Sequence, residues 1–391
     1  MRKVFNACTL YLGIRCLYAL QGVLYSSGGL ISRALLLLFL LMSIYYTCTT
    51  FGKYKFPSLL RGITCLFVLL SCYGVFLLFT NSDFYAAGNP VPKFEYLKSI
   101  LLSFTPIYAC YHFTKQNQLT ENNIRVWIVV FIIVATLSYY RVQSEVVFQT
   151  GNENITNNMA YSFIALLPAI FLFQKRPLVQ YLILGYCMLF VLFSMKRGAI
   201  LIGVFALIYF LYINRKVVQK KYKVLTNFLT IGIFFVGAFV VNSYLISNEY
   251  FVSRIDATME GDSSNRDQLY TYFLSHFMEE QNPINFLFGH GANGTLSIYI
   301  DYAHNDWLEL AINQGLLGLL VYAIYWVMFI KSIRQFRENA LMKNYLTIFF
   351  IIFFVKSFFS MSYQMNIYAS AILGYMIGAH GISKGQYLKL S

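Results

Sequence analysis

The stretch AHNDWLELAINQGLLG, residues 303–318, marks the point where the longest polar segment of the chain returns to apolar sequence. Asn305 and Asp306 are residue types that start helices, and the apolar positions from Trp307 onward predict that a helix continues from there. His304 then lies beside backbone N–H groups that have no partner within the helix. We expect this histidine where water, a lipid headgroup and the positive pole of the helix meet.

The composition of the whole chain is that of a membrane protein with several spans. Hydrophobic residues make up 58% of the chain and charged residues 12%, and the mean hydropathy is +0.58. A soluble core could not bury so large an apolar fraction. The first apolar run, residues 4–20, lacks a small-residue cleavage site at its end, so we interpret it as the first span rather than as a signal peptide.

The cysteines and the net charge also point to the bilayer. All seven cysteines fall in apolar runs, which favours small core residues over a disulfide framework or a metal site. The net charge is +14, but the basic residues cluster in short segments between apolar runs. Contact with anionic membrane lipids explains this pattern, and nucleic acid is not expected as a partner.

The apolar runs predict the fold class. A bilayer core about 30 Å thick needs roughly 20 apolar residues per helix. The sequence therefore predicts an all-α, polytopic integral membrane protein with about 12 transmembrane helices. The predicted spans cover residues 4–21, 34–51, 59–80, 96–114, 124–141, 159–174, 178–195, 198–213, 224–246, 306–330, 345–361 and 365–382.

The basic residues predict the orientation of these spans. With the amino terminus in the cytoplasm, most of the 30 lysines and arginines fall on the cytoplasmic face, and the positive-inside rule then places both termini there. The chain divides into residues 1–158 with spans 1–5, 159–246 with spans 6–9 and an outer Lys-Arg-Gly turn, a large periplasmic loop at 247–305, and 306–391 with spans 10–12 and a cytoplasmic tail. A loop of that length is usually functional.

The long loop has a helical part and a glycine-rich part. The run Ser-Ser-Asn at 263–265 predicts the start of a helix that extends to about residue 280. Its apolar residues Leu269, Phe273 and Phe277 predict a face that lies on the membrane surface or caps the bundle. The glycine-rich turn at 288–294 then leads back to the opening stretch.

Several cations lie where the positive-inside rule disfavours them, and Lys196, Arg197, Arg254 and Arg266 are the informative ones. Arg266 also opposes the dipole of its predicted helix unless an anion lies between them. Arginines joined by a helix amino terminus make a suitable diphosphate clamp. Two alternatives stay open. Lys196 and Arg197 could snorkel to headgroup phosphates, and the other two could pair with carboxylates on a solvated face, namely Asp256, Asp262 or Asp267.

His304 is the candidate general base, since a neutral imidazole near pH 7 can take a proton from an attacking hydroxyl. The alternative is an interfacial histidine that is hydrogen-bonded to a loop carbonyl. Asn305, Asp306 and Glu309 are the supporting residues, although either carboxylate could serve only to cap the helix.

Other ionisable residues carry weaker hypotheses. His276, His290 and His304 are evenly spaced but match no zinc ligand signature, so no metal site is expected. Arg15 and Lys356 lie in predicted spans, where ionisable groups can mark a conduction path. Both are close enough to the outer ends that we interpret them as snorkelling side chains.

Several motifs carry a family resemblance. They are SMKRGA at 194–199, the segment 254–270, NFLFGHG at 285–291, and AHN at 303–305 followed by GLLG at 315–318. In this order they resemble the O-antigen ligase and O-antigen polymerase superfamily, over about residues 190–330. The His-Asn helix start followed by Gly-Leu-Leu-Gly is fairly specific to that superfamily.

The resemblance implies a bacterial inner-membrane glycosyltransferase that works on the periplasmic side, inverts the anomeric centre and uses no metal or other cofactor. Its donor would be a glycan on undecaprenyl diphosphate, and its acceptor a glycan or the lipid A core. Position by position, Arg197 and Arg266 resemble the diphosphate-binding arginines, with Arg254 and Lys196 beside them, and His304 resembles the catalytic histidine. The chain has Lys-Arg-Gly where ligases more often have Ser-Arg-Gly, which counts against the ligase.

The leading prediction is a polymerase of O-antigen, capsule or exopolysaccharide that transfers the growing chain from one lipid carrier to the next. A chain-length regulator protein could be a further partner. The first alternative is an O-antigen ligase, which places the chain on lipid A core as part of lipopolysaccharide synthesis. The second is a flippase for lipid-linked oligosaccharide, a class expected to carry ionisable groups near the midplane and paired halves.

Overall fold

Each of the twelve apolar stretches predicted as spans corresponds to a helix in the computed structural model, which describes residues 6–80, 83–150, 156–217, 220–246, 248–249, 251–253, 256, 266–361 and 366–380. The helices are α1 (Ala7–Ala19), α2 (Leu30–Lys53), α3 (Ser58–Leu78), α4 (Lys93–Lys115), α5 (Glu121–Thr150), α6 (Ala160–Leu166) with its continuation η1 (Leu167–Phe173), α7 (Pro177–Phe193), α8 (Arg197–Val217), α9 (Lys223–Val240), α14 (Asp306–Gln335), α15 (Ala340–Lys356) and α16 (Ile367–His380).

The helix lengths bear on the number of spans. Within the described residues, six helices are long and apolar enough to cross a membrane, namely α2, α3, α5, α8, α9 and α14. Shorter apolar helices, among them α1 and α7, accompany them. An all-α membrane protein is thus confirmed, whereas the count of about 12 spans stays a prediction. One small antiparallel strand pair that was not predicted, β1 (Phe84–Ala86) and β2 (Asn89–Val91), joins α3 to α4.

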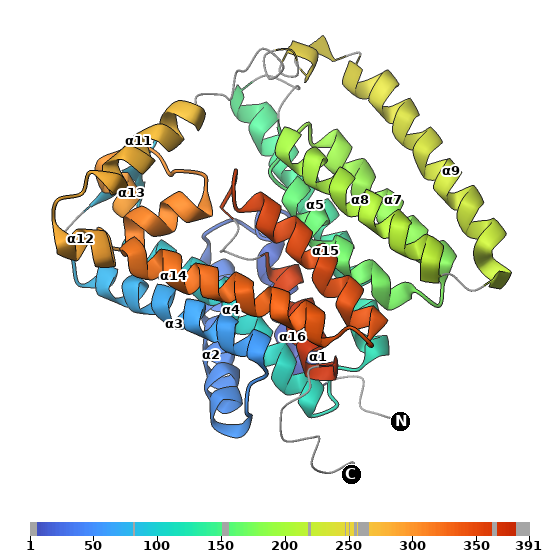
Figure 1. Ribbon diagram of the computed structural model, residues 1–391, viewed down its shortest axis with the longest axis horizontal. Coiled ribbons are helices and arrows are strands. Elements are labelled where there is room, and N and C mark those ends of the chain that lie inside the picture. The colour runs from blue at the N-terminus through green and yellow to red at the C-terminus, as the bar shows by residue number, and fades with distance from the viewer. Residues whose placement is uncertain are drawn as a thin grey trace.

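The centre of the bundle is the pair α4 and α16 (Figure 1). α4 is buried without interruption from Ser103 to Phe113. The hydroxyl of Ser370 on α16 donates to the carbonyl of Ser103 (2.5 Å), and a Cβ at Gly374 would overlap the carbonyl of Ile107. In a bilayer the hydrophobic effect does not bring helices together, so they associate through close packing at small residues and through interhelical hydrogen bonds.

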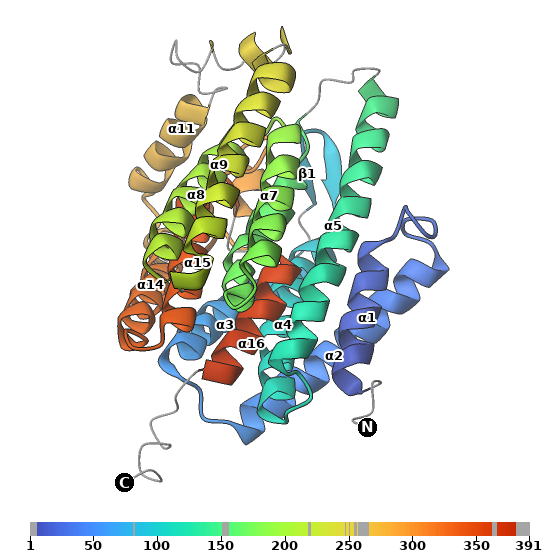
Figure 2. The ribbon, with the colours of Figure 1, turned by 90° about the vertical axis from the view of Figure 1, so that its right-hand side faces the viewer.

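α9 lies at the rim of the bundle and contacts α7 (Figure 2). Phe228, Phe235 and Phe239 expose 69, 74 and 70% of their surface. Such a continuous apolar face would be a liability in water but suits the hydrocarbon of a bilayer.

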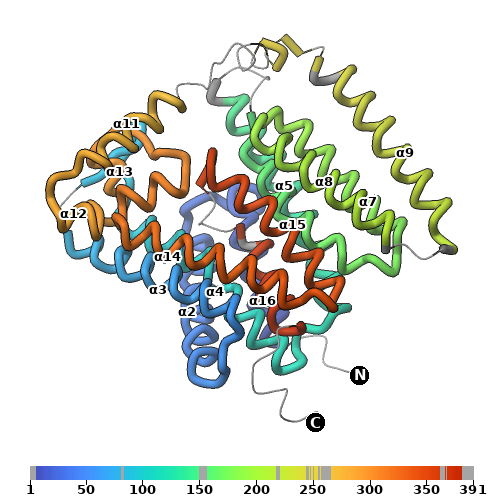
Figure 3. The backbone as a smooth tube through the Cα atoms, viewed as in Figure 1, coloured from blue at the N-terminus to red at the C-terminus, as the bar shows by residue number. Residues whose placement is uncertain are grey.

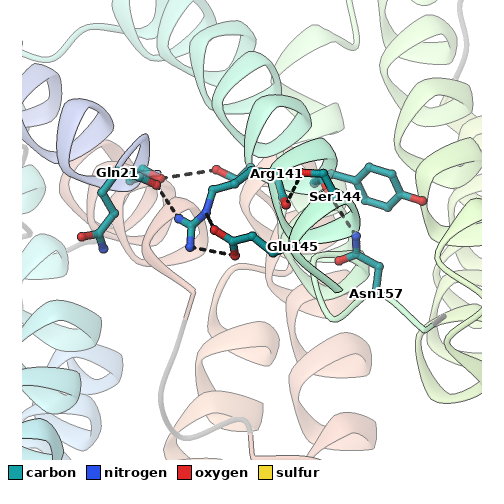
Figure 4. A network of polar contacts seen from close by, with 8 residues as sticks. Gln21, Arg141, Ser144, Glu145 and Asn157 are labelled. Carbon is teal, nitrogen blue, oxygen red and sulfur yellow. Dashed lines mark hydrogen bonds and ion pairs between the residues drawn. The ribbon is translucent and has the colours of Figure 1, made fainter. Parts of the chain in front are cut away.

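α5 continues past its predicted end at residue 141 as far as Thr150. Nε of Arg141 donates to Oε1 of Glu145 one turn later (2.8 Å), and Nη1 donates to the carbonyl of Gln21 at the end of α1 (Figure 4). Hydropathy marks where a helix leaves the apolar layer, but a polar helix with i,i+4 pairs can continue into water. The predicted outer connection at 141–158 is therefore helical over its first part.

The region between α9 and α14 contains α11 (Arg266–Met278), α12 (Pro283–Phe288) and α13 (Gly294–Ile298), which gather at one end of α3 and α14 (Figure 3). α11 confirms the predicted loop helix, although the expected start at 263–265 lies outside the described residues. Phe273 and Phe277 pack against the turn before α14 and its first turns. The apolar face of α11 thus caps the bundle.

α14 begins at Asp306, as the sequence predicts, and is interrupted at Gly315, whose φ is 65°. The carbonyls of Ile312 and Asn313 accept hydrogen bonds from the N–H groups of His290 (2.8 Å) and Gly291 (3.0 Å). A Cβ at Gly315 would lie 2.6 Å from the nitrogen of residue 289. Glycine is therefore needed here because it adopts a positive φ without strain and because no side chain would fit. The glycine-rich turn therefore docks into a break in the helix, which satisfies backbone groups there.

Candidate active site

His304 lies in the turn immediately before α14. Its φ of 52° falls in the left-handed region, which non-glycine residues seldom adopt and which clusters at functional sites. Its carbonyl accepts from the hydroxyl of Tyr270 on α11 (3.3 Å). The next residue, Asn305, caps α14 by accepting from the N–H groups of the following turn, and its Nδ2 donates to the carbonyl of Phe358 (3.0 Å). The backbone around the imidazole is thus fixed on both sides.

The imidazole of His304 is partly open to solvent, with 44% of its side-chain surface exposed. Nε2 lies 3.7 Å from Oδ2 of Asp301, which is long for a hydrogen bond. Burial lowers the pKa of His304 below its ordinary value, the Asp301 carboxylate opposes this, and the charges of Arg266 and Lys196 lower the pKa further. The ring is therefore neutral at pH 7, and both cations lie within electrostatic range of it.

Arg266 is the first residue of α11, and its side chain is half-buried. Nη1 donates to the carbonyl of Phe359 (3.0 Å). A guanidinium has five N–H donors, and this bond, which orients the group, uses one of them. Arg254, another cation of the predicted clamp, lies outside the described residues.

Lys196 and Arg197 form the start of α8. The carbonyl of Lys196 accepts from the N–H of Ile200 (3.0 Å), and both cationic side chains are half-buried. Gly198 packs against Phe359, whose carbonyl accepts the hydrogen bond from Arg266. A Cβ at Gly198 would lie 2.7 Å from Cε2 of Phe359. The amino-terminal ends of α8 and α11, each with partial positive charge, therefore both approach Phe359.

Phe359 belongs to the connection after α15, residues 357–361, which we call the 357–361 connection. Its backbone carbonyls accept two bonds from the start of α14, one from α11 and one from α15: Ser357 from the N–H of Asp306 (2.8 Å), Phe358 from Asn305, Phe359 from Arg266 and Met361 from Nζ of Lys356 (2.8 Å). This connection could not be predicted from the sequence, because carbonyl groups carry no residue-type signature. The available signal was the pair Ser357 and Ser360, which interrupt the aromatic run.

Lys356 belongs to the site, and the interpretation of it as a snorkelling lysine was incomplete. In addition to its bond with Met361, its Nζ lies 4.6 Å from the ring centroid of Tyr161 on α6 and interacts electrostatically with Lys196. The other intramembrane cation, Arg15, instead lies over the ring of Tyr18, 5.3 Å from its centroid.

Asp306 and Glu309 are fully buried at the start of α14, where they hold the turn that carries His304. Oδ2 of Asp306 accepts from the hydroxyl of Tyr322 (2.7 Å). Oε1 of Glu309 accepts from the N–H of Ala303 (2.6 Å), and Oε2 accepts from Oγ1 of Thr295 (2.9 Å). Their geometry is that of positioning residues rather than of groups that face a substrate.

A small polar hollow of about 110 Å³ adjoins the site. Tyr302, two residues before His304, and Met361, at the end of the 357–361 connection, contribute to its wall, together with Glu95, Tyr96, Ser99, Val91, Asn293 and Asn313. Nδ2 of Asn293 is buried and has no hydrogen-bond partner within the described residues. The wall of the hollow combines polar and apolar groups, a mixture that suits a sugar.

The three evenly spaced histidines separate in the structure. His276 and His290 come together, with ring centroids 5.5 Å apart, whereas His304 lies beside Asp301. Even spacing in sequence therefore did not predict a common site for the three.

Comparison with protein families gives a match over part of the chain. The model of a family described as O-antigen ligase matches residues 182–323. No curated protein matches the chain. The matched residues run from α7 into α14, and they include Lys196, Arg197, Arg266 and His304. The match confirms the resemblance to the O-antigen ligase and polymerase superfamily that the sequence motifs indicate.

Proposed function

Because residues 182–323 match the O-antigen ligase family, we propose that this membrane protein is a glycosyltransferase that moves a glycan from a polyprenyl diphosphate carrier to a sugar hydroxyl. The observation that supports the proposal is that Lys196 and Arg266 both lie within electrostatic range of the imidazole of His304, and that Arg266 is hydrogen-bonded to the 357–361 connection. We further propose that undecaprenyl diphosphate is the carrier, and that the site faces the periplasm of a bacterial inner membrane.

The diphosphate binds between the amino-terminal ends of α8 and α11. Arg197 and Arg266 offer planar guanidinium groups that pair with phosphate oxygens, and Lys196 adds a point charge. Both helix ends add partial positive charge. Negative charge grows on the diphosphate as the glycosidic bond breaks, so these cations stabilise the transition state more than the bound donor. They carry out in this site the charge neutralisation for which other transferases use a metal ion.

His304 acts as the general base. The acceptor hydroxyl attacks the anomeric carbon as the bond from that carbon to the diphosphate oxygen breaks. The hydroxyl proton passes to the neutral imidazole, and the lipid diphosphate leaves as an anion. Asp301, 3.7 Å from Nε2, stabilises the imidazolium that forms. A single displacement of this kind inverts the anomeric centre. The polar hollow lined by Tyr302 and Asn293 is the proposed place for the acceptor sugar.

A polymerase is the first candidate, because the chain carries Lys-Arg-Gly at 196–198. A ligase is the second, and the description of the matching family favours it. Purified protein in liposomes that contain only lipid-linked repeat units tests the choice, with products measured by gel and mass analysis. A ladder of chain lengths supports the polymerase. Transfer of an unchanged chain, only when lipid A core is added, supports the ligase.

The same assay tests the transfer itself. His304→Ala should abolish product, whereas His380→Ala, at the far end of α16, should leave the yield unchanged. Movement of lipid-linked glycan across the bilayer without any new glycosidic bond would support the flippase instead.

A further inference from the structure

A cluster of potential metal ligands lies in the loop region, apart from the proposed transfer site. His276, Glu280 and His290 each offer one ligand atom, and these atoms all lie within 4.8 Å of one another. His276 comes from the last turn of α11, Glu280 follows the end of that helix, and His290 belongs to the glycine-rich turn. Residues fourteen positions apart thus meet through the fold rather than through a short motif.

The orientation of the three side chains converges on one point. Oε1 of Glu280 accepts from the N–H of Asn282 (2.9 Å), which turns Oε2 toward Nε2 of His290, 3.0 Å away. Nε2 of His276 is buried and has no hydrogen-bond partner within the described residues. A buried, unsatisfied imidazole nitrogen beside a second imidazole and a carboxylate is a feature that a bound cation would explain.

The backbone holds these ligands in place. The N–H of His290 donates to the carbonyl of Ile312 in the break of α14, so this histidine is anchored to a transmembrane helix. His276 stacks on Tyr272, whose hydroxyl donates to the carbonyl of Ile298 (3.1 Å). Ligands fixed in this way need little reorganisation to bind a metal ion.

We propose that His276, Glu280 and His290 bind a divalent transition-metal ion of the zinc class, with water completing the coordination. Two imidazoles and one carboxylate form a recognised zinc ligand set, whereas calcium and magnesium prefer all-oxygen sites. The ion joins the carboxyl end of α11 to the glycine-rich turn. It thereby fixes the helix that carries Arg266, while the transfer step itself involves His304 and the cations.

Zinc binding to the purified full-length protein tests this proposal without any glycan substrate. The protein in detergent is stripped with a chelator and freed of it, and Zn²⁺ is then titrated by calorimetry, with metal content measured by mass spectrometry. We expect one Zn²⁺ per chain and a higher unfolding temperature. Glu280→Gln and His276→Ala should each weaken the affinity for Zn²⁺. Loss of a residue that only hydrogen-bonds to a metal ligand costs about 10- to 100-fold, so loss of a ligand should cost at least as much. Glutamine at position 280 keeps an oxygen that can accept from the N–H of Asn282.

His304→Ala is the matched control, because it removes a histidine from the proposed transfer site but not from the cluster. It should bind Zn²⁺ as the wild type does while losing transferase activity. Equal zinc affinity in the wild type and the His276→Ala, His290→Ala double variant would overturn the metal site. Because binding is measured without donor or acceptor, that result would leave the proposed transferase untouched.

Discussion

At the residue scale, the site depends on the environment of one imidazole. His304 is held in a left-handed backbone conformation, between the carboxylate of Asp301 and the charges of Arg266 and Lys196. The carboxylate raises the pKa of the histidine and the two cations lower it, so each neighbour has a defined sign. Because the neighbours shift the pKa of His304 in known directions, variants of these neighbours can distinguish a catalytic base from a structural histidine.

The pH dependence of turnover follows from these signs. A general base acts in its neutral form, so kcat/KM should rise with pH through the lowered pKa of His304 and then stay level above it. Asp301→Asn removes the group that raises this pKa, so the acidic limb should move to lower pH. Lys196→Met removes a group that lowers it, so the limb should move to higher pH. Initial rates measured across pH give the acidic limb for the wild type and both variants. The same limb in all three proteins would contradict the assignment of His304 as the general base.

The arginine at the start of α11 gives a second prediction at this scale. Arg266→Ala should lower turnover about 10²- to 10³-fold, because it removes a donor that faces developing charge. Arg266→Lys should recover only part of the rate, since lysine keeps the charge but loses the planar fork. Arg334→Ala, an exposed arginine near the end of α14, is the control and should behave as the wild type. Unchanged kcat in Arg266→Ala would remove this residue from the clamp.

At the scale of elements, the break in α14 positions the loop region on the bundle. The glycine-rich turn fills the break, and Glu309 ties the turn before the helix to α13. Gly-Leu-Leu-Gly at 315–318, which the sequence offers only as a motif of resemblance, is thus a structural requirement: its first glycine allows two backbones to approach. Helix positions were predictable from apolar length, but a break caused by a docked loop was not.

Gly315→Ala tests this requirement. A Cβ would strain a backbone with φ of 65° and would meet the backbone of residues 287–289, so the unfolding free energy should fall by more than about 1 kcal/mol. Gly185→Ala in α7, where a Cβ would meet no atom within 4 Å, is the matched control and should not destabilise the protein. Thermal unfolding in detergent measures both. Equal stability of the two variants would show that the break is not constrained.

The sequence offered candidates for the side chains of the site but not for its frame. Arg266 and Lys196 could be selected because charge on the disfavoured side of a membrane is visible in sequence, and His304 because it precedes a predicted helix start. The 357–361 connection could not, since it acts through carbonyl groups, and the role of Lys356 depends on where that connection turns. The helical extension of α5 past Arg141 was missed for a related reason, because hydropathy detects the edge of the apolar layer and not the end of a helix.

At the scale of the whole molecule, the helices predict a polarity across the bilayer. α14 is long and apolar enough to span it, with Asp301 and His304 just before one end and Arg334 near the other. The proposed periplasmic position of the transfer site and the predicted cytoplasmic position of the termini depend on this crossing and on the distribution of basic residues.

Cysteine labelling of intact cells tests that polarity. Asp301→Cys should react with a membrane-impermeant maleimide added from outside, whereas Arg334→Cys should react only after the membrane is opened. The wild-type protein, whose seven cysteines lie in apolar runs, gives the background signal. Labelling of both variants from the same side would exclude a crossing by α14.

The most direct measurement is the release of lipid diphosphate from a defined lipid-linked glycan by reconstituted protein, followed with time and compared between the wild type, His304→Ala and His380→Ala. Loss of the base should slow release by about 10²- to 10⁴-fold, while the control keeps the wild-type rate. Release at the wild-type rate from His304→Ala would contradict a transfer in which this imidazole takes the proton.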